Sequence, residues 1–290
     1  MPAPAPPPNM QRVKLGITGL AQQQTNALVA WHKNVSLAHP LLVVLFFHGQ
    51  EDDPQNFAWT HHHLPDQVAD CDKNAVLIAP TMQMEDNNVV TDYLSSRDRI
   101  GAFVRQGLAA VRQSLGKDPD ANWVDQAFNT AGLHLVGFSN GHRAWSAAIR
   151  ALRSPVSSTI DPPPSVIGHS LFDCLYWSTP LMDGVDREAP SINARFSNKG
   201  RAILKSAFVT THFTSANETL QTQAKLLREM IRNDGTVVSH DHIPDDLGPN
   251  DIVMTVLPTS VHLEAVSRDS GLSHVMAAAS GFDLPPGPSA

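Results

Sequence analysis

A short turn sequence near the middle of the chain carries the residue types that nucleophilic catalysis needs. Ser139 lies between Gly137 and Gly141, after the apolar run 133–136 and before a stretch of small residues. A serine at a sharp turn from strand to helix presents its hydroxyl above the sheet, and the two glycines leave room for the neighbouring backbone. The spacing therefore predicts a nucleophilic serine at position 139.

An unactivated serine hydroxyl is a weak nucleophile at neutral pH, so catalysis also requires a base and a carboxylate that orients the base. Two histidines follow the last clearly predicted strand. His274 lies in the small-residue segment 270–274, which we expect to be a loop before the final helix. His262 alternates with Val261 and Leu263, as a strand residue would. Either histidine is a candidate base.

The strand, Gly-x-Ser-x-Gly turn and helix around Ser139 resemble the α/β-hydrolase superfamily of serine esterases, lipases and related acyl hydrolases. The resemblance extends over most of the chain and rests on the order of the motifs. It implies an α/β-hydrolase fold, in which helices flank a mostly parallel central sheet. It also implies a loop or small lid inserted after the sixth strand, at about 174–200.

The pair His48-Gly49 follows the continuously apolar segment 41–47 and resembles the oxyanion-hole segment of this superfamily. The resemblance assigns the two oxyanion-hole donors to the backbone N–H groups of Gln50 and Asn140. Such dipoles, aimed at the charge that develops during the reaction, are each worth on the order of 3 kcal/mol in the transition state.

The resemblance also ranks the candidates for base and acid. The superfamily histidine lies in a loop like 270–274, which favours His274 and leaves His262 as the alternative base. In most members the acid follows the strand after the lid, where the first carboxylate in this chain is Glu218. Some lipase-like members place the acid one strand earlier, where this chain has Asp173. We choose Asp173 as the acid and keep Glu218, which would also suit a helix N-terminus, as the alternative acid.

The rest of the chain alternates between strand and helix patterns, as is typical of a mostly parallel sheet. The expected strands are 13–17 and 26–32, which would form an opening hairpin, and then 41–47, 75–80, 133–136, 166–173, 202–209 and 252–257. The expected helices are 100–115, with Ser95 or Ser96 as a start signal, 142–153, and 220–231. We expect one domain at 12–284, between a flexible Pro-rich tail at 1–11 and a loose C-terminal tail at 285–290.

Length and composition limit the classes of partner. The chain has 290 residues and a net charge of -7, so it lacks the basic excess of a nucleic-acid-binding protein. It has no run of 18 apolar residues to span a membrane. The Pro-rich start lacks the parts of a secretory signal, which favours a cytoplasmic location and leaves secretion open. Two cysteines are too few for a disulfide framework, and nothing indicates an oligomeric state.

Two polar clusters contain the residue types of a metal site. They are His61-His62-His63 and the segment 239–246, which holds two histidines and three aspartates. Neither cluster has the spacing that defines a metal site, so we expect no metal and no organic cofactor. His142, directly after the second glycine of the turn, is interpreted as a residue of a helix N-terminus.

These features predict a serine hydrolase that cleaves a small-molecule carboxylic ester through an acyl-enzyme formed on Ser139. The same groups would also serve an amidase or a peptidase. A non-catalytic binding protein with a hydrolase fold is a further alternative, and the intact serine, histidine and glycine motifs argue against it.

Overall fold

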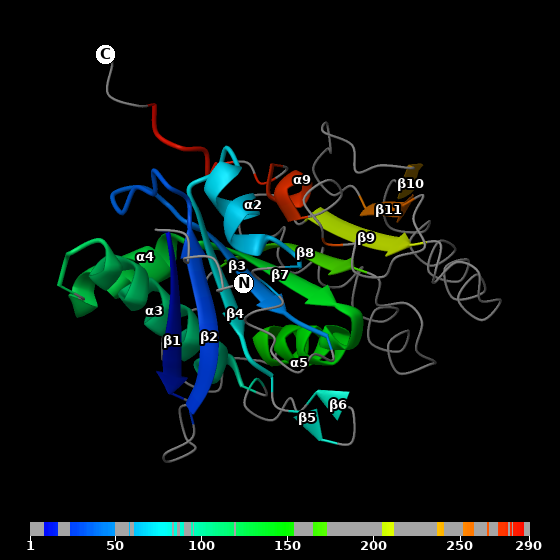
Figure 1. Ribbon diagram of the computed structural model, residues 1–290, viewed down its shortest axis with the longest axis horizontal. Helices are drawn as coiled ribbons and strands as arrows, with labels where there is room; N and C mark the ends of the chain where they lie inside the picture. Colours follow the sequence, from blue (N-terminus) through cyan, green and yellow to red (C-terminus); the bar gives the residue numbers. More distant parts are fainter. Residues whose placement is uncertain are drawn as a thin grey trace, which may run out of the picture.

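The computed structural model describes residues 9–16, 24–49, 58, 61–82, 84–85, 88–89, 94, 96–118, 120–153, 165–172, 205–211, 237–240, 252–257, 266, 272–277, 279 and 281–286 (Figure 1). Within these residues the main element is a nine-stranded sheet. Its strands, in order across the sheet, are β1 (Met10–Gly16), β2 (Gln24–Trp31), β4 (Ala75–Pro80), β3 (Leu42–Phe47), β7 (Gly132–Phe138), β8 (Ser165–Phe172), β9 (Lys205–Thr211), β11 (Ile252–Leu257) and β10 (Val237–His240).

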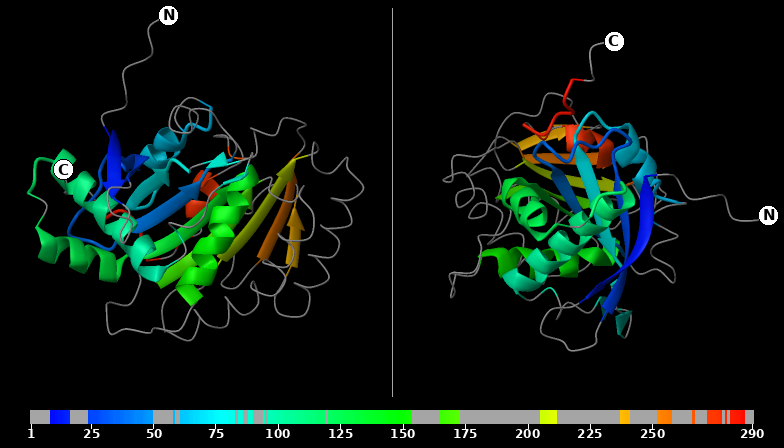
Figure 2. Two further views of the ribbon diagram at one scale, coloured as in Figure 1. Left: turned by 90° about the horizontal axis from the view of Figure 1, so that it is seen from below. Right: turned by 90° about the vertical axis from the view of Figure 1, so that its left-hand side faces the viewer.

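The sheet is mostly parallel. Within the nine described strands of this sheet, β2 runs antiparallel to its neighbours β1 and β4, and every other adjacent pair is parallel. Parallel neighbours need crossover connections, which place helices over the faces of the sheet. The helices α3 (Arg97–Ser114), α4 (Ala121–Thr130) and α5 (His142–Arg153) pack on one face, and α2 (Leu64–Asp70) and α9 (Leu272–Ala277) on the other (Figures 1 and 2).

Strand β3 shows why this arrangement follows from the sequence. Val43, Leu45 and Phe47 belong to the apolar cluster that includes α3, α4 and α5. The alternate residues Leu42, Val44 and Phe46 belong to the cluster that includes α2 and α9. Because successive side chains of a strand point to opposite faces, a strand covered on both faces must be apolar at every position.

The structure confirms the predicted long helix and its start signal. The Ser96 hydroxyl accepts a hydrogen bond from the Arg99 N–H at 3.3 Å, which caps α3. Strand β1 begins at Met10 and therefore includes two residues that the sequence analysis assigned to the tail. The Asn9 side chain donates a 2.6 Å hydrogen bond to the Trp31 carbonyl, which holds this end of the chain on β2.

Several short elements were not predicted. They are α2, α4, β10 and the hairpin of β5 (Met84–Glu85) and β6 (Asn88–Val89). Helix α2 has seven residues and β10 has four, which is too short for a hydrophobic period to stand out. Helix α4 did carry the signal, because Val124, Ala127 and Phe128 are buried at helical spacing.

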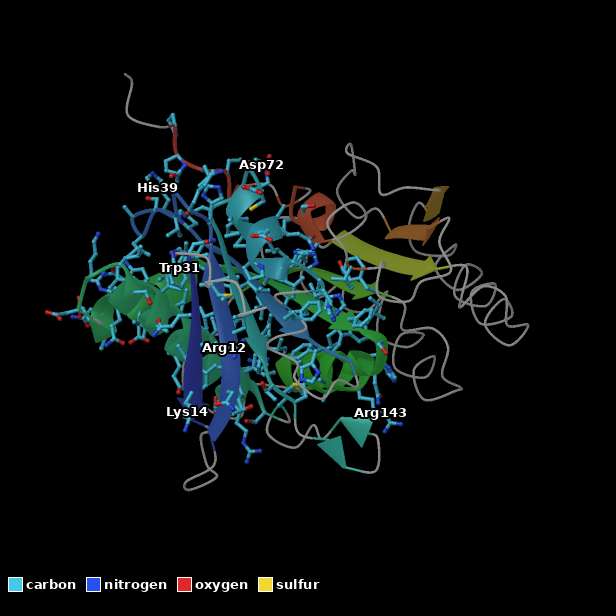
Figure 3. All side chains as sticks on the ribbon, viewed as in Figure 1. Arg12, Lys14, Trp31, His39, Asp72 and Arg143 are labelled. Carbon is cyan, nitrogen blue, oxygen red and sulfur yellow. The ribbon has the colours of Figure 1, made fainter. Side chains whose placement is uncertain are left out.

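Strand β1 forms one edge of the sheet. Arg12 and Lys14, labelled in Figure 3, are exposed on it. Charged side chains on an edge strand disfavour pairing with a strand of another molecule. No helix in the described part of the chain combines the length and the hydropathy needed to cross a bilayer.

A mostly parallel sheet with helices on both faces, and a serine at the turn from β7 into a helix, constitute the predicted α/β-hydrolase fold. The expected lid at about 174–200 and the expected helix 220–231 lie outside the described residues.

Candidate active site

Ser139 lies directly after β7, in the one-turn helix η2 (Ser139–Gly141) that leads into α5. Its φ angle is 51°, in the left-handed region that residues other than glycine seldom adopt. This conformation costs an L-residue about 1–2 kcal/mol, so the surrounding packing must impose it. The serine is also buried, with 6% of its surface exposed.

The two glycines beside Ser139 both have close neighbours. A Cβ atom added at Gly141 would overlap the carbonyl oxygen of Phe47 and lie 2.6 Å from that of His48. One added at Gly137 would lie 3.0 Å from Leu171 Cδ2, on the next strand. The predicted reason therefore holds for Gly141, where backbone atoms leave no room for a side chain. At Gly137 the contact is tight, and the leucine side chain would have to move by a few tenths of an ångström.

The segment after β3 reaches the serine as well. Phe47 pairs with Gly137, so His48 and Gly49 leave the sheet beside the turn that carries Ser139. A Cβ atom added at Gly49 would lie 2.8 Å from Ser139 Cβ and 3.1 Å from Ser139 Oγ. The backbone of Gly49 therefore lies against the serine side chain.

His48 links the segment after β3 to the segment after β4. The Met82 N–H donates to His48 Nε2 at 2.6 Å. Because Nε2 accepts, the ring hydrogen is on Nδ1, which donates to the Gly49 carbonyl at 2.6 Å. The imidazole is 2% exposed, so both ring nitrogens make hydrogen bonds within the protein.

His142 contacts the backbone of the turn at Ser139 itself. Its Nδ1 lies 3.0 Å from the Ser139 carbonyl oxygen. Burial lowers the pKa of His142 to about 4, the hydrogen bond to Ser139 opposes this shift, and the Arg143 charge adds to it. The ring is therefore neutral at pH 7, with Nδ1–H as the donor. The neighbouring Arg143, labelled in Figure 3, is exposed.

The structure describes only part of the predicted constellation. Asn140 follows Ser139 in η2 and is 4% exposed. Gln50, Asp173, Glu218 and His262 lie outside the described residues.

The predicted loop at His274 is wrong, because α9 begins at Leu272 and the backbone of His274 lies in its first turn. The helix starts early because Leu272 and Met276, four residues apart, are both buried against the sheet. The side chain of His274 is not described.

Strand register places the ends of β7 and β8 at the same level of the sheet. Phe172, the last residue of β8, pairs with Phe138, the last residue of β7. Asp173 and Ser139 are the next residues of their respective segments. Glu218 is seven positions beyond Thr211, the end of β9. The chain therefore leaves adjacent strands at the same level just before Ser139 and Asp173.

No group of three or more histidine, cysteine, aspartate or glutamate residues gathers as a metal site in the described part of the chain. Within His61-His62-His63, the central ring is fully buried beside Phe138, while the other two residues are exposed. The three side chains therefore do not converge on one ion. The cluster 239–246 extends beyond the described residues. Cys71 is a buried free thiol whose pKa burial raises to about 11.

Sequence reasoning missed Gln67, a buried residue of α2 whose side-chain amide donates to the His62 carbonyl and accepts from the N–H of Ser273 in α9. A signal was present, because a glutamine stands at a position where the helical spacing of α2 calls for an apolar side chain.

No family model and no curated protein matches the chain. Similar solved structures include an esterase from Thermogutta terrifontis with bound propionate, at 14% identity, covering 87% of this chain and 83% of that chain, with a TM-score of 0.46. An S-formylglutathione hydrolase from Agrobacterium tumefaciens is 12% identical, with coverages of 89% and 90% and a TM-score of 0.47. A mutant feruloyl esterase module from Clostridium thermocellum, complexed with sinapinate, is 12% identical, with coverages of 96% and 89% and a TM-score of 0.49. These identities are too low to transfer an activity.

Proposed function

We propose that the protein is a serine hydrolase that cleaves a carboxylic ester through an acyl-enzyme on Ser139. The observation that carries the proposal is the strained φ of 51° at Ser139, combined with the contact between Gly49 and its side chain. Strain of this kind persists only where the surrounding structure imposes it, and it clusters at functional sites. An ordinary strand-to-helix turn needs neither feature.

The proposed reaction has two stages. Ser139 Oγ attacks the ester carbonyl while its proton passes to His274, which Asp173 orients. The tetrahedral intermediate then expels the alcohol, which takes the proton from His274, and the acyl group remains on Ser139. Water then attacks the acyl-enzyme and gives its proton to His274. Ser139 leaves with that proton, and the carboxylic acid is released. No metal or organic cofactor takes part in this scheme.

The hydrogen bonds of two histidines support Gln50 and Asn140 as oxyanion donors. A peptide group is planar, so holding its carbonyl also fixes the direction of the N–H on the following residue. His48 holds the Gly49 carbonyl, whose peptide includes the Gln50 N–H. His142 holds the Ser139 carbonyl, whose peptide includes the Asn140 N–H. Donors that are fixed before the reaction stabilise the oxyanion without reorganising.

The register of β8 supports Asp173 over Glu218 as the acid, because Phe172 and Phe138 end adjacent strands at one level. His274 is preferred to His262 as the base, since α9 is anchored by the buried Leu272 and Met276. Glu218 and His262 are retained as the alternatives that mutation must exclude.

Active-site labelling combined with a substrate panel tests the proposal. A fluorophosphonate should modify the folded protein once, at Ser139, as located by peptide mass spectrometry. The protein should hydrolyse short- or long-chain p-nitrophenyl esters faster than peptide amides, and Ser139→Ala should remove both labelling and turnover. Faster cleavage of amides would favour the amidase alternative. Absence of labelling and of all turnover would leave a binding protein with a hydrolase fold.

A further inference from the structure

Gln67 is a polar residue on the buried face of a helix. Helix α2 buries Leu64 and Val68 on one face, and Gln67 lies between them with 2% of its surface exposed. The apolar cluster there also contains Leu272 and Met276 of α9. An amide buried among apolar side chains costs free energy unless its hydrogen bonds are made.

All polar atoms of this side chain have partners, and the partners come from three segments. The Gln67 amide nitrogen donates to the carbonyl oxygens of His62 and Val266, both at 2.7 Å. Its amide oxygen accepts from the Ser273 N–H at 3.1 Å. Val266 and Ser273 lie 199 and 206 positions away in the sequence. One side chain thus joins α2 to the segments at 266 and 273.

The His62 bond leads towards the nucleophile. The His62 ring is fully buried and packs edge-on against Phe138, with ring centroids 4.7 Å apart and an interplanar angle of 70°. Phe138 is the residue before Ser139. Gln67 is therefore connected to the nucleophile elbow through one hydrogen bond and one aromatic contact.

The Ser273 bond leads towards the base. Ser273 is the second residue of α9, where backbone N–H groups have no acceptor within the helix. The Gln67 oxygen supplies an acceptor from outside the helix, and the next residue is His274. The hydrogen bond therefore fixes the first turn of α9 against α2.

We infer that Gln67 is a positioning residue, whose amide sets the separation between the nucleophile elbow at Ser139 and the first turn of α9 that carries His274. This inference rests on the proposed function, in which His274 is the base. Proton transfer requires the base within hydrogen-bond reach of the serine hydroxyl, and a displacement of about 1 Å costs on the order of 100-fold in rate.

Two substitutions test the amide. Gln67→Met keeps the approximate volume and removes all three hydrogen bonds. It should lower kcat by about 10- to 100-fold with little change in KM, because the groups displaced act on the reacting proton. The rate of fluorophosphonate labelling at Ser139 should fall by a similar factor. Gln67→Glu, with its carboxyl protonated among carbonyl oxygens, retains the acceptor and one donor, and its kcat should lie between those of wild type and Gln67→Met.

Val68→Ala is the matched control. Val68 is the next residue of α2, is fully buried in the same cluster, and its truncation weakens packing without touching the three hydrogen bonds. Urea unfolding measures how much stability each variant loses. The kcat values are then compared between variants that lose similar amounts of stability. Val68→Ala should keep the wild-type kcat.

Wild-type kcat and labelling in folded Gln67→Met would overturn the inference. So would an equal loss of kcat in Val68→Ala, because the cause would then be general loosening of α2. If Gln67→Met does not fold, the same comparison is made with Gln67→Glu, and a wild-type kcat there overturns the inference. A wild-type protein with neither turnover nor labelling would overturn the proposed function together with this inference. An active wild type with unaffected Gln67 variants overturns the inference alone.

Discussion

Gly49 lies so close to Ser139 that a side chain at position 49 would enter the space of the serine, with its Cβ 2.8 Å from Ser139 Cβ. Segments 90 positions apart in sequence therefore meet at the hydroxyl proposed as nucleophile. By contrast, a Cβ added at Gly116 or Gly281 would meet no atom within 4 Å.

Gly49→Ala should lower kcat/KM by about 100-fold, because the new methyl group displaces the serine side chain or the segment beside it. Overpacking should also reduce the free energy of unfolding by about 1–3 kcal/mol. Gly116→Ala is the control, since Gly116 has a φ of 71° with no atom within 4 Å of the added carbon. That variant should lose about 1 kcal/mol of stability and keep its kcat/KM. Equal kcat/KM in Gly49→Ala and wild type would mean that the contact has no catalytic role.

Ser139→Gly should be more stable than Ser139→Ala by about 1 kcal/mol, because glycine adopts a φ of 51° without steric cost. Both variants lack the hydroxyl and should be inactive, so their difference isolates the backbone strain. Urea denaturation monitored by tryptophan fluorescence measures the two free energies of unfolding. A Ser139→Ala protein as stable as Ser139→Gly would show that the turn stores no strain.

His48→Phe should lower kcat by about 10- to 100-fold with KM little changed, because the Gly49 carbonyl, and with it the Gln50 N–H, loses its fixed direction. His134→Phe is the matched control. His134 is also buried and hydrogen-bonded, to the Ser170 hydroxyl at 2.9 Å, but it lies within β7 away from the segment after β3. Steady-state kinetics on one p-nitrophenyl ester compares the two. The role assigned to His48 is wrong if both variants lose kcat equally.

The stability of the protein should decrease as the pH falls from 6.5 to about 4. The folded-state pKa of His142, at about 4, lies below the ordinary 6.5, so the unfolded chain binds more protons within that interval. The contribution of His142 to the free energy of unfolding is fully present above pH 6.5. Acidification to below about pH 4 removes it, and the loss is at most about 3 kcal/mol. Burial also lowers the pKa of His32, which acts in the same direction.

Urea unfolding at several pH values checks this dependence. His142→Gln should flatten it, because an amide in place of the imidazole does not titrate. His39→Gln, at the exposed His39 labelled in Figure 3, is the matched histidine-to-glutamine control with which His142→Gln is compared. An unaltered pH dependence in His142→Gln would assign the acid sensitivity to other groups.

The rival acids and bases are separated by four substitutions. Asp173→Asn should leave a folded protein whose kcat falls by about 10⁴-fold, because an amide does not stabilise the imidazolium. Glu218→Gln should have little effect. His274→Ala should match the loss in Ser139→Ala, since members of one catalytic unit are not additive, while His262→Ala should cost only packing. If Glu218→Gln loses more kcat than Asp173→Asn, Glu218 is the acid, and if His262→Ala loses more than His274→Ala, His262 is the base. Either result leaves the hydrolase proposal intact.

Patterns within a few residues were sufficient for several predictions. The apolar run, the glycine spacing and the small residues around Ser139 specify strand, turn and helix, because each acts through local backbone geometry. The doubly buried strand β3 was equally visible, since a strand covered on both faces is apolar at every position. Two short elements were not predicted because their own periodicity is too brief to indicate them. Helix α2 is held by tertiary packing and β10 by its pairing with β11.

The amino-acid sequence by itself determined the fold class, the candidate nucleophile and the reason for Gly141. Tertiary structure decided which distant groups meet there. The sheet order brings Gly49 against Ser139, and the packing of α2 on α9 brings Gln67 to Ser273 and makes the segment at His274 helical, where a loop was expected. These contacts join residues 90 and 206 positions apart, and they depend on how strands and helices assemble, which no local pattern of side chains encodes.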